Sequence, residues 1–186
     1  MVYIFLADGF EESEAILPAD ILKRAGLDVC LVSITADKLV ASSHGFQIMA
    51  DAVFSEIDLT QAVALIMPGG MPGAQNLCDF APLREAIIKQ NECGGLLCAI
   101  CAAQMTLGAA GVLKDKRATC YPGFEKYLDC KVYTERLVEE DGHIITGRGP
   151  GAAAEFGFVI AERLTSADCV AQLRQGMIYA PTTYRP

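Results

Sequence analysis

Four short, continuous apolar runs, separated by segments with helical character, most strongly constrain the fold of this chain. The runs are bounded by Gly, Pro or Asp and occupy Val2–Ala7, Asp28–Ile34, Ala62–Met67 and Leu96–Ile100. Runs of this kind are typical of strands buried on both faces of a parallel sheet. Helix-like segments lie between or after them, at Glu12–Ala25, Pro82–Gln90 and Ala102–Ala110. The alternation predicts an α/β fold with a doubly wound, mostly parallel sheet sandwiched by helices.

The remaining segments predict additions to this sheet. A small hairpin is expected where Leu39–Ala41 and Gln47–Ala50 flank a polar turn. Further strands are expected at Ala118–Cys120, Leu137–Glu140 and His143–Thr146. Asp141-Gly142 is a strong two-residue hairpin signal between the last two, so the sheet should be mixed at one side. Two final helices are expected at Ala152–Leu164 and Asp168–Arg174.

The length of 186 residues fits one domain, and no linker or internal repeat divides it. We therefore expect a single domain over residues 1–175 and a loose C-terminal tail over 176–186. The net charge of −8 disfavours nucleic acid and anionic membranes as partners. No apolar run is long enough for a spanning helix, and no signal peptide precedes the first strand, so a cytoplasmic protein is expected.

Eight cysteines are present, at positions 30, 78, 93, 98, 101, 120, 130 and 169. A chain of this size and apolarity does not need disulfides, so reduced thiols are expected. The cysteines lack paired ligand spacing and there are only two histidines, so no metal site is expected.

Cys101 stands where the fourth apolar run meets a helix that opens with small residues, Ala102 and Ala103. This pattern is typical of a nucleophile elbow, in which a strained turn requires small neighbours. The start of the helix favours a thiolate through its free N–H groups and its dipole. From spacing alone, a buried cysteine that packs as a small hydrophobe is an equally good interpretation.

Two further segments are expected at the same edge of the sheet as Cys101. The third apolar run ends in a glycine-rich turn. The backbone N–H groups of Gly70 and Ala102 could together bind an oxyanion. The alternative is that this segment is a plain tight turn. Glu14 follows the first strand and is the acid/base candidate. A carboxylate in a first helical turn is otherwise simply solvated.

Four motifs resemble those of the ThiJ/PfpI superfamily, and the resemblance covers about residues 2–174. The motifs occur in the same order as in the superfamily, and the four together are far more specific than any one of them alone. They are Asp8-Gly9-Phe10-Glu11-Glu12-Ser13-Glu14, Met67-Pro68-Gly69-Gly70, Ala99-Ile100-Cys101-Ala102 and Gly147-Arg148-Gly149-Pro150-Gly151. They are most similar to the branch that contains the parkinsonism-associated protein deglycase and bacterial ThiJ-type proteins. The resemblance implies a flavodoxin-like fold, related to class I glutamine amidotransferases, and a homodimer.

The resemblance also implies a site. Cys101 would be the elbow nucleophile, Glu14 its protonated carboxyl partner, and Gly69 and Gly70 the adjacent turn. The expected activity is glyoxalase-like or deglycase-like, acts on small 2-oxoaldehydes or glycated proteins, and needs no cofactor. A non-enzymatic oxidative-stress sensor or redox chaperone that uses oxidation of Cys101 is the alternative.

The sequence departs from the superfamily pattern in ways that disfavour other chemistry. Tyr121 stands where animal members carry a histidine, and Ala102 where the protease branch has one, so an intracellular peptidase is a weaker hypothesis. His44 and Arg24 match basic positions of the family, and both, together with Tyr121, are expected at the site's periphery or at a partner subunit. An exposed loop histidine and a structural arginine are the alternatives.

Two further chemistries are disfavoured. Thiol exchange by a Cys98–Cys101 pair conflicts with the expected position of Cys98 inside a strand. Glutamine amidotransfer would need a later catalytic histidine, but His143 lies in an expected strand beside a hairpin turn.

Overall fold

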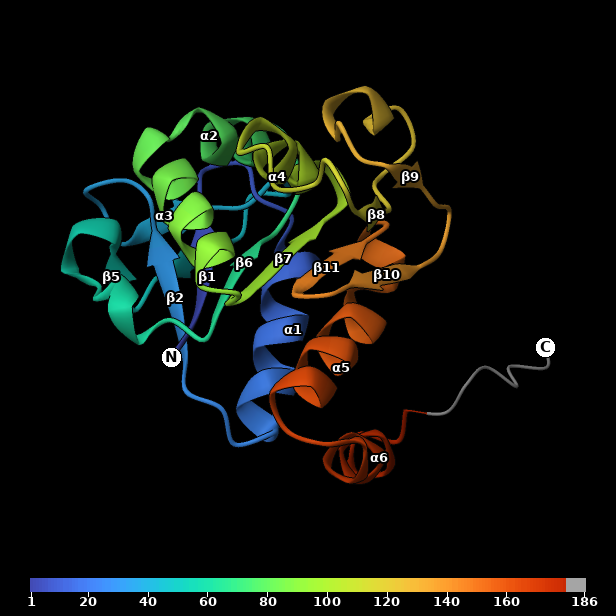
Figure 1. Ribbon diagram of the computed structural model, residues 1–186. Helices are drawn as coiled ribbons and strands as arrows, with labels where there is room; N and C mark the ends of the chain where they lie inside the picture. Colours follow the sequence, from blue (N-terminus) through green and yellow to red (C-terminus); the bar gives the residue numbers. More distant parts are fainter. Residues whose placement is uncertain (180–186) are drawn as a thin grey trace.

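The computed structural model describes residues 1–179, and a seven-stranded sheet runs through its centre (Figure 1). Its strands are β1 (Val2–Leu6), β2 (Val29–Ser33), β5 (Ala52–Val53), β6 (Ala64–Met67), β7 (Leu96–Ile100), β10 (Val138–Asp141) and β11 (Ile144–Gly147). They lie in the order β10-β11-β7-β6-β1-β2-β5, and all neighbours are parallel except β10 and β11. The mixed edge expected at the Asp141-Gly142 turn is therefore confirmed.

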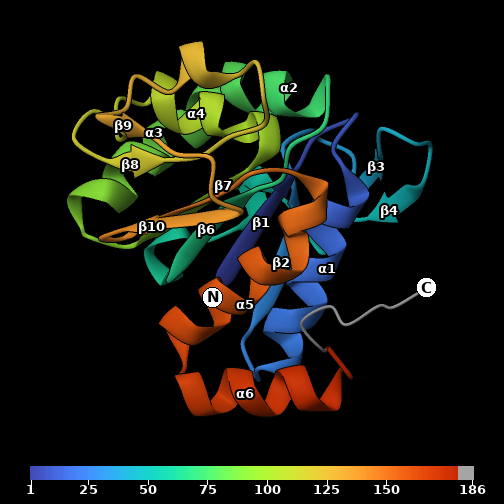
Figure 2. The ribbon, with the colours of Figure 1, turned by 90° about the vertical axis from the view of Figure 1, so that its right-hand side faces the viewer.

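Helices cover both faces of the sheet, as Figure 2 shows most clearly. Helices α1 (Glu12–Arg24) and α5 (Ala153–Leu164) pack together on one face, with α6 (Ala167–Gly176) beside α5. Helices α2 (Gly73–Asp79), α3 (Ala81–Glu92) and α4 (Gln104–Ala109) cover the other. Every residue of β1, β6 and β7 is buried between these layers, which explains their unbroken apolar sequences. The fold is the expected flavodoxin-like sandwich.

The close contact between α1 and α5 depends on one glycine. A Cβ at Gly157 would lie 2.9 Å from Ile21 Cδ1 and 3.1 Å from Pro18 Cα. Such distances leave no room for a side chain in a closely packed interior. Gly157 therefore lets α1 and α5 lie close together.

The smaller elements differ in part from the expectations. Strands β3 (Leu39–Ala41) and β4 (Gln47–Met49) form the expected hairpin. The strand expected at 118–120 is only β8 (Arg117–Ala118), paired with β9 (Val132–Tyr133) outside the main sheet. Short 3₁₀ turns lie at Phe54–Glu56, Leu59–Gln61, Cys101–Ala103, Glu125–Tyr127 and Pro150–Ala152. Helix α2 was not expected, because its start after Pro72 and at Gly73 has the composition of a turn.

The chain remains packed beyond the residue at which a tail was expected to begin. Helix α6 reaches Gly176, and the Tyr179 hydroxyl donates a hydrogen bond of 2.9 Å to Glu155 Oε1 on α5. Arg174 pairs with the same carboxylate and lies over the Phe158 ring. Residues 180–186 of the expected tail lie outside the described residues. Within residues 1–179, no helix has the length and apolarity required to cross a membrane.

The strand order places one edge of the sheet in position to hold a ligand. From β1 the chain continues to β2 on one side, and later forms β6 and β7 on the other. In open α/β sheets, ligands bind outside the carboxyl ends of the strands at such a reversal. The segments that follow β1, β6 and β7 therefore meet at the favoured location.

Candidate functional site

Cys101 directly follows β7 and adopts a backbone conformation that cysteine rarely takes. Its φ is +65°, in the left-handed region, and it opens the 3₁₀ turn that leads into α4. Outside glycine this conformation is strained and is concentrated at functional sites. The side chain is only 8% exposed. The structure thus places the thiol on a strand-to-helix elbow, shielded from bulk water.

Two groups outside the turn hold the elbow in place. The Tyr121 backbone N–H donates to the Cys101 carbonyl at 3.2 Å. The fully buried Gln104 amide donates from Nε2 to the carbonyls of Ala99 and Gly147, which ties the ends of β7 and β11 together. Sequence reasoning missed Gln104, although an amide in an otherwise apolar helix start could have indicated it. The strained turn is therefore held by one backbone hydrogen bond from Tyr121 and by the side-chain hydrogen bonds of Gln104.

Glu14 is a fully buried carboxyl group on the first turns of α1. Its Oε2 accepts a hydrogen bond of 2.8 Å from the Gly69 N–H, whereas its Oε1 has no partner among the described residues. Burial raises the pKa of Glu14 to about 7, and the nearby negative charge of Glu11 acts in the same direction. A buried carboxyl group with one hydrogen bond is costly to ionise, so it readily holds a proton.

Gly69, in the glycine-rich turn after β6, lies between Glu14 and Cys101 and has no side chain to keep them apart. A Cβ at Gly69 would lie 2.6 Å from both Cys101 Cβ and Glu14 Oε2. Any side chain at this position would push the thiol and the carboxyl group apart. The next residue, Gly70, has a φ of +84°, and its N–H faces the sulfur together with that of Ala102.

The electrostatics of Cys101 differ from the sequence-based expectation of a lowered thiol pKa. The N–H groups of Gly70 and Ala102 do lower it, as expected at a helix start. Burial and the adjacent negative charge of Glu14 outweigh them and raise the pKa of Cys101 to about 12. The two groups therefore do not carry two negative charges at neutral pH. A thiolate at Cys101 requires the proton on Glu14, and Oε1 is the oxygen left free to hold it.

This burial predicts a pH-dependent effect of Glu14 on stability. The folded pKa of about 7 lies above the ordinary value of 4.5, so the contribution is fully present below pH 4.5 and is lost as pH rises through 7. A shift of this size corresponds to roughly 3 kcal/mol. We expect Glu14→Gln to gain stability relative to wild type between pH 5 and pH 8 in urea unfolding. A difference between the two proteins that does not change with pH would contradict the raised pKa.

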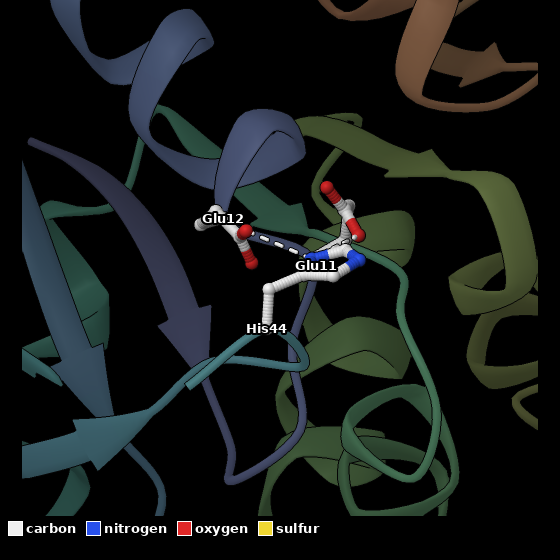
Figure 3. A group of neighbouring side chains, drawn as sticks. All are labelled: Glu11, Glu12 and His44. Carbon is white, nitrogen blue, oxygen red and sulfur yellow. Dashed lines mark hydrogen bonds and ion pairs between the residues drawn. The ribbon is translucent and has the colours of Figure 1, made fainter. Parts of the chain in front are cut away.

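The three peripheral residues expected from the resemblance have different positions. His44 lies on the β3–β4 turn, and its Nδ1 is 2.8 Å from Glu12 Oε1 of the same chain (Figure 3). Tyr121 reaches the elbow through its backbone, while its side chain is largely exposed and lies against Gly149. Arg24 is ten residues beyond Glu14 on α1, roughly 15 Å along the helix axis, and pairs with Asp20. It does not belong to the site within one chain.

Two cavities of the described residues lie in the part of the molecule around α3 and around Tyr121. One, of about 630 Å³, lies between α3 and the segment after β5 and does not include Cys101. A shallow one of about 260 Å³ adjoins the elbow and is lined by Tyr121, Pro122, Leu137 and residues 148–152. Neither is lined by Cys101 itself.

Comparison with known proteins identifies the family of the chain. Protein DJ-1 homolog B of Arabidopsis thaliana is 36% identical over 97% of this chain, which spans only 42% of that protein. The glutathione-independent glyoxalase DJR-1.2 of Caenorhabditis elegans is 34% identical, over 83% of this chain and 82% of its own length. The solved structure of Toxoplasma gondii DJ-1, oxidized, superposes with a TM-score of 0.92 at 30% identity and covers 97% of this chain and 98% of its own. Residues 1–163 match the model of the DJ-1/PfpI family, and the chain belongs to that family.

Proposed function

We propose that the chain is a cofactor-independent, glyoxalase-like or deglycase-like enzyme that acts on 2-oxoaldehydes or their protein adducts, with Cys101 as nucleophile. The main support is the free Oε1 of buried Glu14 beside the elbow thiol. A carboxyl group of this kind can hold a proton in one step and remove one in another. The name of the Caenorhabditis elegans relative, a glutathione-independent glyoxalase, gives the reaction class.

In the proposed reaction, the Cys101 thiolate attacks the aldehyde carbon of methylglyoxal and forms a C–S bond. The carbonyl oxygen becomes an oxyanion, which the N–H groups of Gly70 and Ala102 stabilise until it is protonated. Glu14 then moves a proton from the former aldehyde carbon to the adjacent carbon, and the hydroxyl proton of the hemithioacetal passes to the former ketone oxygen, which converts the hemithioacetal into a thioester. Water hydrolyses the thioester, which releases lactate and restores the thiol.

On glycated side chains, the hemithioacetal or aminocarbinol adduct first breaks its C–S or C–N bond, which releases the side-chain thiol or amine and the free aldehyde, and the aldehyde then follows the same steps. The Cys101 side chain is 8% exposed, so free aldehydes reach it more readily than adducts on a folded protein. We therefore expect the free aldehyde to be the better substrate.

Product analysis tests the proposal. The wild-type protein, incubated with methylglyoxal without glutathione, is expected to form lactate well above the rate in buffer. In D₂O, lactate should carry deuterium at the carbon that receives the proton, to the extent that Glu14 exchanges its proton with solvent. Lactate formation that is no faster with the protein than in buffer would contradict the proposed activity.

The alternative function is sensing of peroxide through oxidation of the same thiol. It is supported by the Toxoplasma gondii relative, whose solved structure is described as oxidized. Under this alternative, limited peroxide adds two oxygens at Cys101 in intact-mass and peptide analysis, without aldehyde turnover. Turnover in the reduced protein that is lost on oxidation would favour the enzyme.

We further propose that two copies of the chain associate through the face formed by α1 and the β3–β4 hairpin. Ile16, Phe46 and Met49 are exposed there, and an apolar groove of about 480 Å³ is lined by residues that include Ile16, Leu17, Phe46 and Ile48. Contiguous exposed apolar surface of this kind marks an interaction site.

We expect Phe46→Asp to shift the protein from dimer to monomer in sedimentation velocity, because it places a charge in the centre of this apolar face. Ile88→Asp on α3, an exposed apolar residue on another face, is the matched control and should remain dimeric. Dimerisation that is equally strong in both variants would place the interface elsewhere.

A further inference from the structure

Three potential metal ligands meet at the start of α1, beside the candidate site but separate from Cys101 and Glu14. They are Glu11, Glu12 and His44, and one ligand atom of each lies within 4.8 Å of the other two. Figure 3 shows His44 reaching from the β3–β4 turn toward the two carboxylates. The cluster joins segments more than thirty residues apart in the sequence, which is why ligand spacing along the chain did not indicate it.

The distances within the cluster suit a small divalent ion. His44 Nδ1 lies 2.8 Å from Glu12 Oε1 and 3.6 Å from Glu11 Oε2. A tetrahedral ion with ligand bonds of about 2.0–2.1 Å holds its ligand atoms roughly 3.3 Å apart. The present separations lie on both sides of this value, so an ion could enter with shifts of a few tenths of an ångström between the imidazole and each carboxylate.

The second oxygen of Glu12 points to a missing partner. Glu12 Oε2 is shielded from solvent and accepts no hydrogen bond from any described residue. A shielded, unpaired carboxylate oxygen is unfavourable and calls for an explanation. A cation bound by the Glu12 carboxylate would compensate its charge and provide that partner.

Neighbouring hydroxyl groups hold the second carboxylate in a fixed orientation. The Ser13 hydroxyl donates to Glu11 Oε1 at 2.8 Å, and the Ser43 hydroxyl donates to Glu11 Oε2 at 3.2 Å. Although Glu11 is the N-cap residue of α1, its side chain does not cap a backbone N–H of the helix. Metal-binding carboxylates are commonly oriented by outer hydrogen bonds of this kind.

We propose that Glu11, Glu12 and His44 form a binding site for a divalent transition-metal ion of the zinc class. One imidazole nitrogen and two carboxylate oxygens suit Zn²⁺, whereas Mg²⁺ and Ca²⁺ prefer all-oxygen ligand sets. The His44 side chain is 63% exposed within a single chain, which leaves room for water to complete the coordination of the ion at the edge of the proposed dimer face.

Zinc binding to wild type, His44→Asn and Glu12→Gln, measured by calorimetry, tests the proposal. Accessible thiols are first alkylated, because free cysteines also bind zinc. We expect one ion per wild-type chain and at least about tenfold weaker binding in either variant. His143→Asn removes the only other histidine, which bonds Asn91, and should bind zinc as wild type does.

Spectroscopy of the wild-type protein tests the proposal without any substitution, in case a variant does not fold. Zinc should shift the imidazole nitrogen resonances of His44 and leave those of His143 unchanged. Cobalt bound at the same site should show no thiolate charge-transfer band. Zinc affinity of His44→Asn within threefold of wild type, or unchanged His44 resonances with bound zinc, would overturn the proposal.

Discussion

Replacing Cys101 with serine is expected to lower the rate of methylglyoxal turnover by about a thousandfold or more, which is the usual size of the effect when a covalent nucleophile is lost. Serine keeps the size and the strained backbone position of Cys101, but its hydroxyl is far less acidic than a thiol. Initial rates of lactate formation by Cys101→Ser and wild type provide the measurement.

The control for this prediction is Cys93→Ser. Cys93 is an exposed thiol at the end of α3, away from the elbow, so its loss should leave the rate unchanged. Both variants need matching circular dichroism and melting temperatures. Equal turnover by Cys101→Ser and wild type would exclude the covalent mechanism through Cys101. A large loss of turnover in Cys93→Ser would indicate that Cys93, on another face of the molecule, takes part in the reaction.

Replacing Glu14 is expected to separate the two roles of its carboxyl group. Glutamine matches glutamate in shape, can accept the Gly69 N–H and can donate from its amide nitrogen to the sulfur, but it cannot transfer a proton. We expect Glu14→Gln to lose turnover by about a hundredfold to ten-thousandfold. Its Cys101 should still react with iodoacetamide at pH 8 within a few-fold of the wild-type rate.

Glu14→Leu provides the contrast, because it removes proton transfer and both hydrogen bonds. The Gly69 N–H, bonded at 2.8 Å in the wild type, would then be unpaired, and a thiolate would face an apolar group. We expect this variant to lose turnover and also to slow alkylation. Normal turnover in Glu14→Gln would show that another group transfers the proton, and equal alkylation in all three proteins would show that Glu14 does not influence the thiol.

Much of the fold could be predicted from the sequence because its signals are local. The apolar runs that became β1, β6 and β7 are buried along their whole length, so their hydrophobicity alone identified them. Helix α2 could not be identified in this way, because Gly73 at its start packs against the backbone of Gly9 and Phe10. That glycine reflects a contact with a distant segment rather than a local preference for a turn.

The proposed site shows the same division. Its residues were identified by their order and spacing in the chain, including Cys101 at a strand-to-helix junction and Glu14 after the first strand. The sequence could not give the pKa of Cys101, because that depends on its burial and on the charge of Glu14, eighty-seven positions away. It also did not show that the Gln104 amide bonds the ends of β7 and β11 or that His44 lies beside Glu12, because both contacts join distant segments.

The sequence by itself therefore determined the family, the order of the elements and the candidate nucleophile, since each depends on residue identity and local pattern. Only the tertiary structure decided which groups share a proton and which form a cluster. Solvent exclusion and charge proximity arise when β1, β6, β7 and the β3–β4 hairpin are brought together, and electrostatic interactions strengthen once water is excluded.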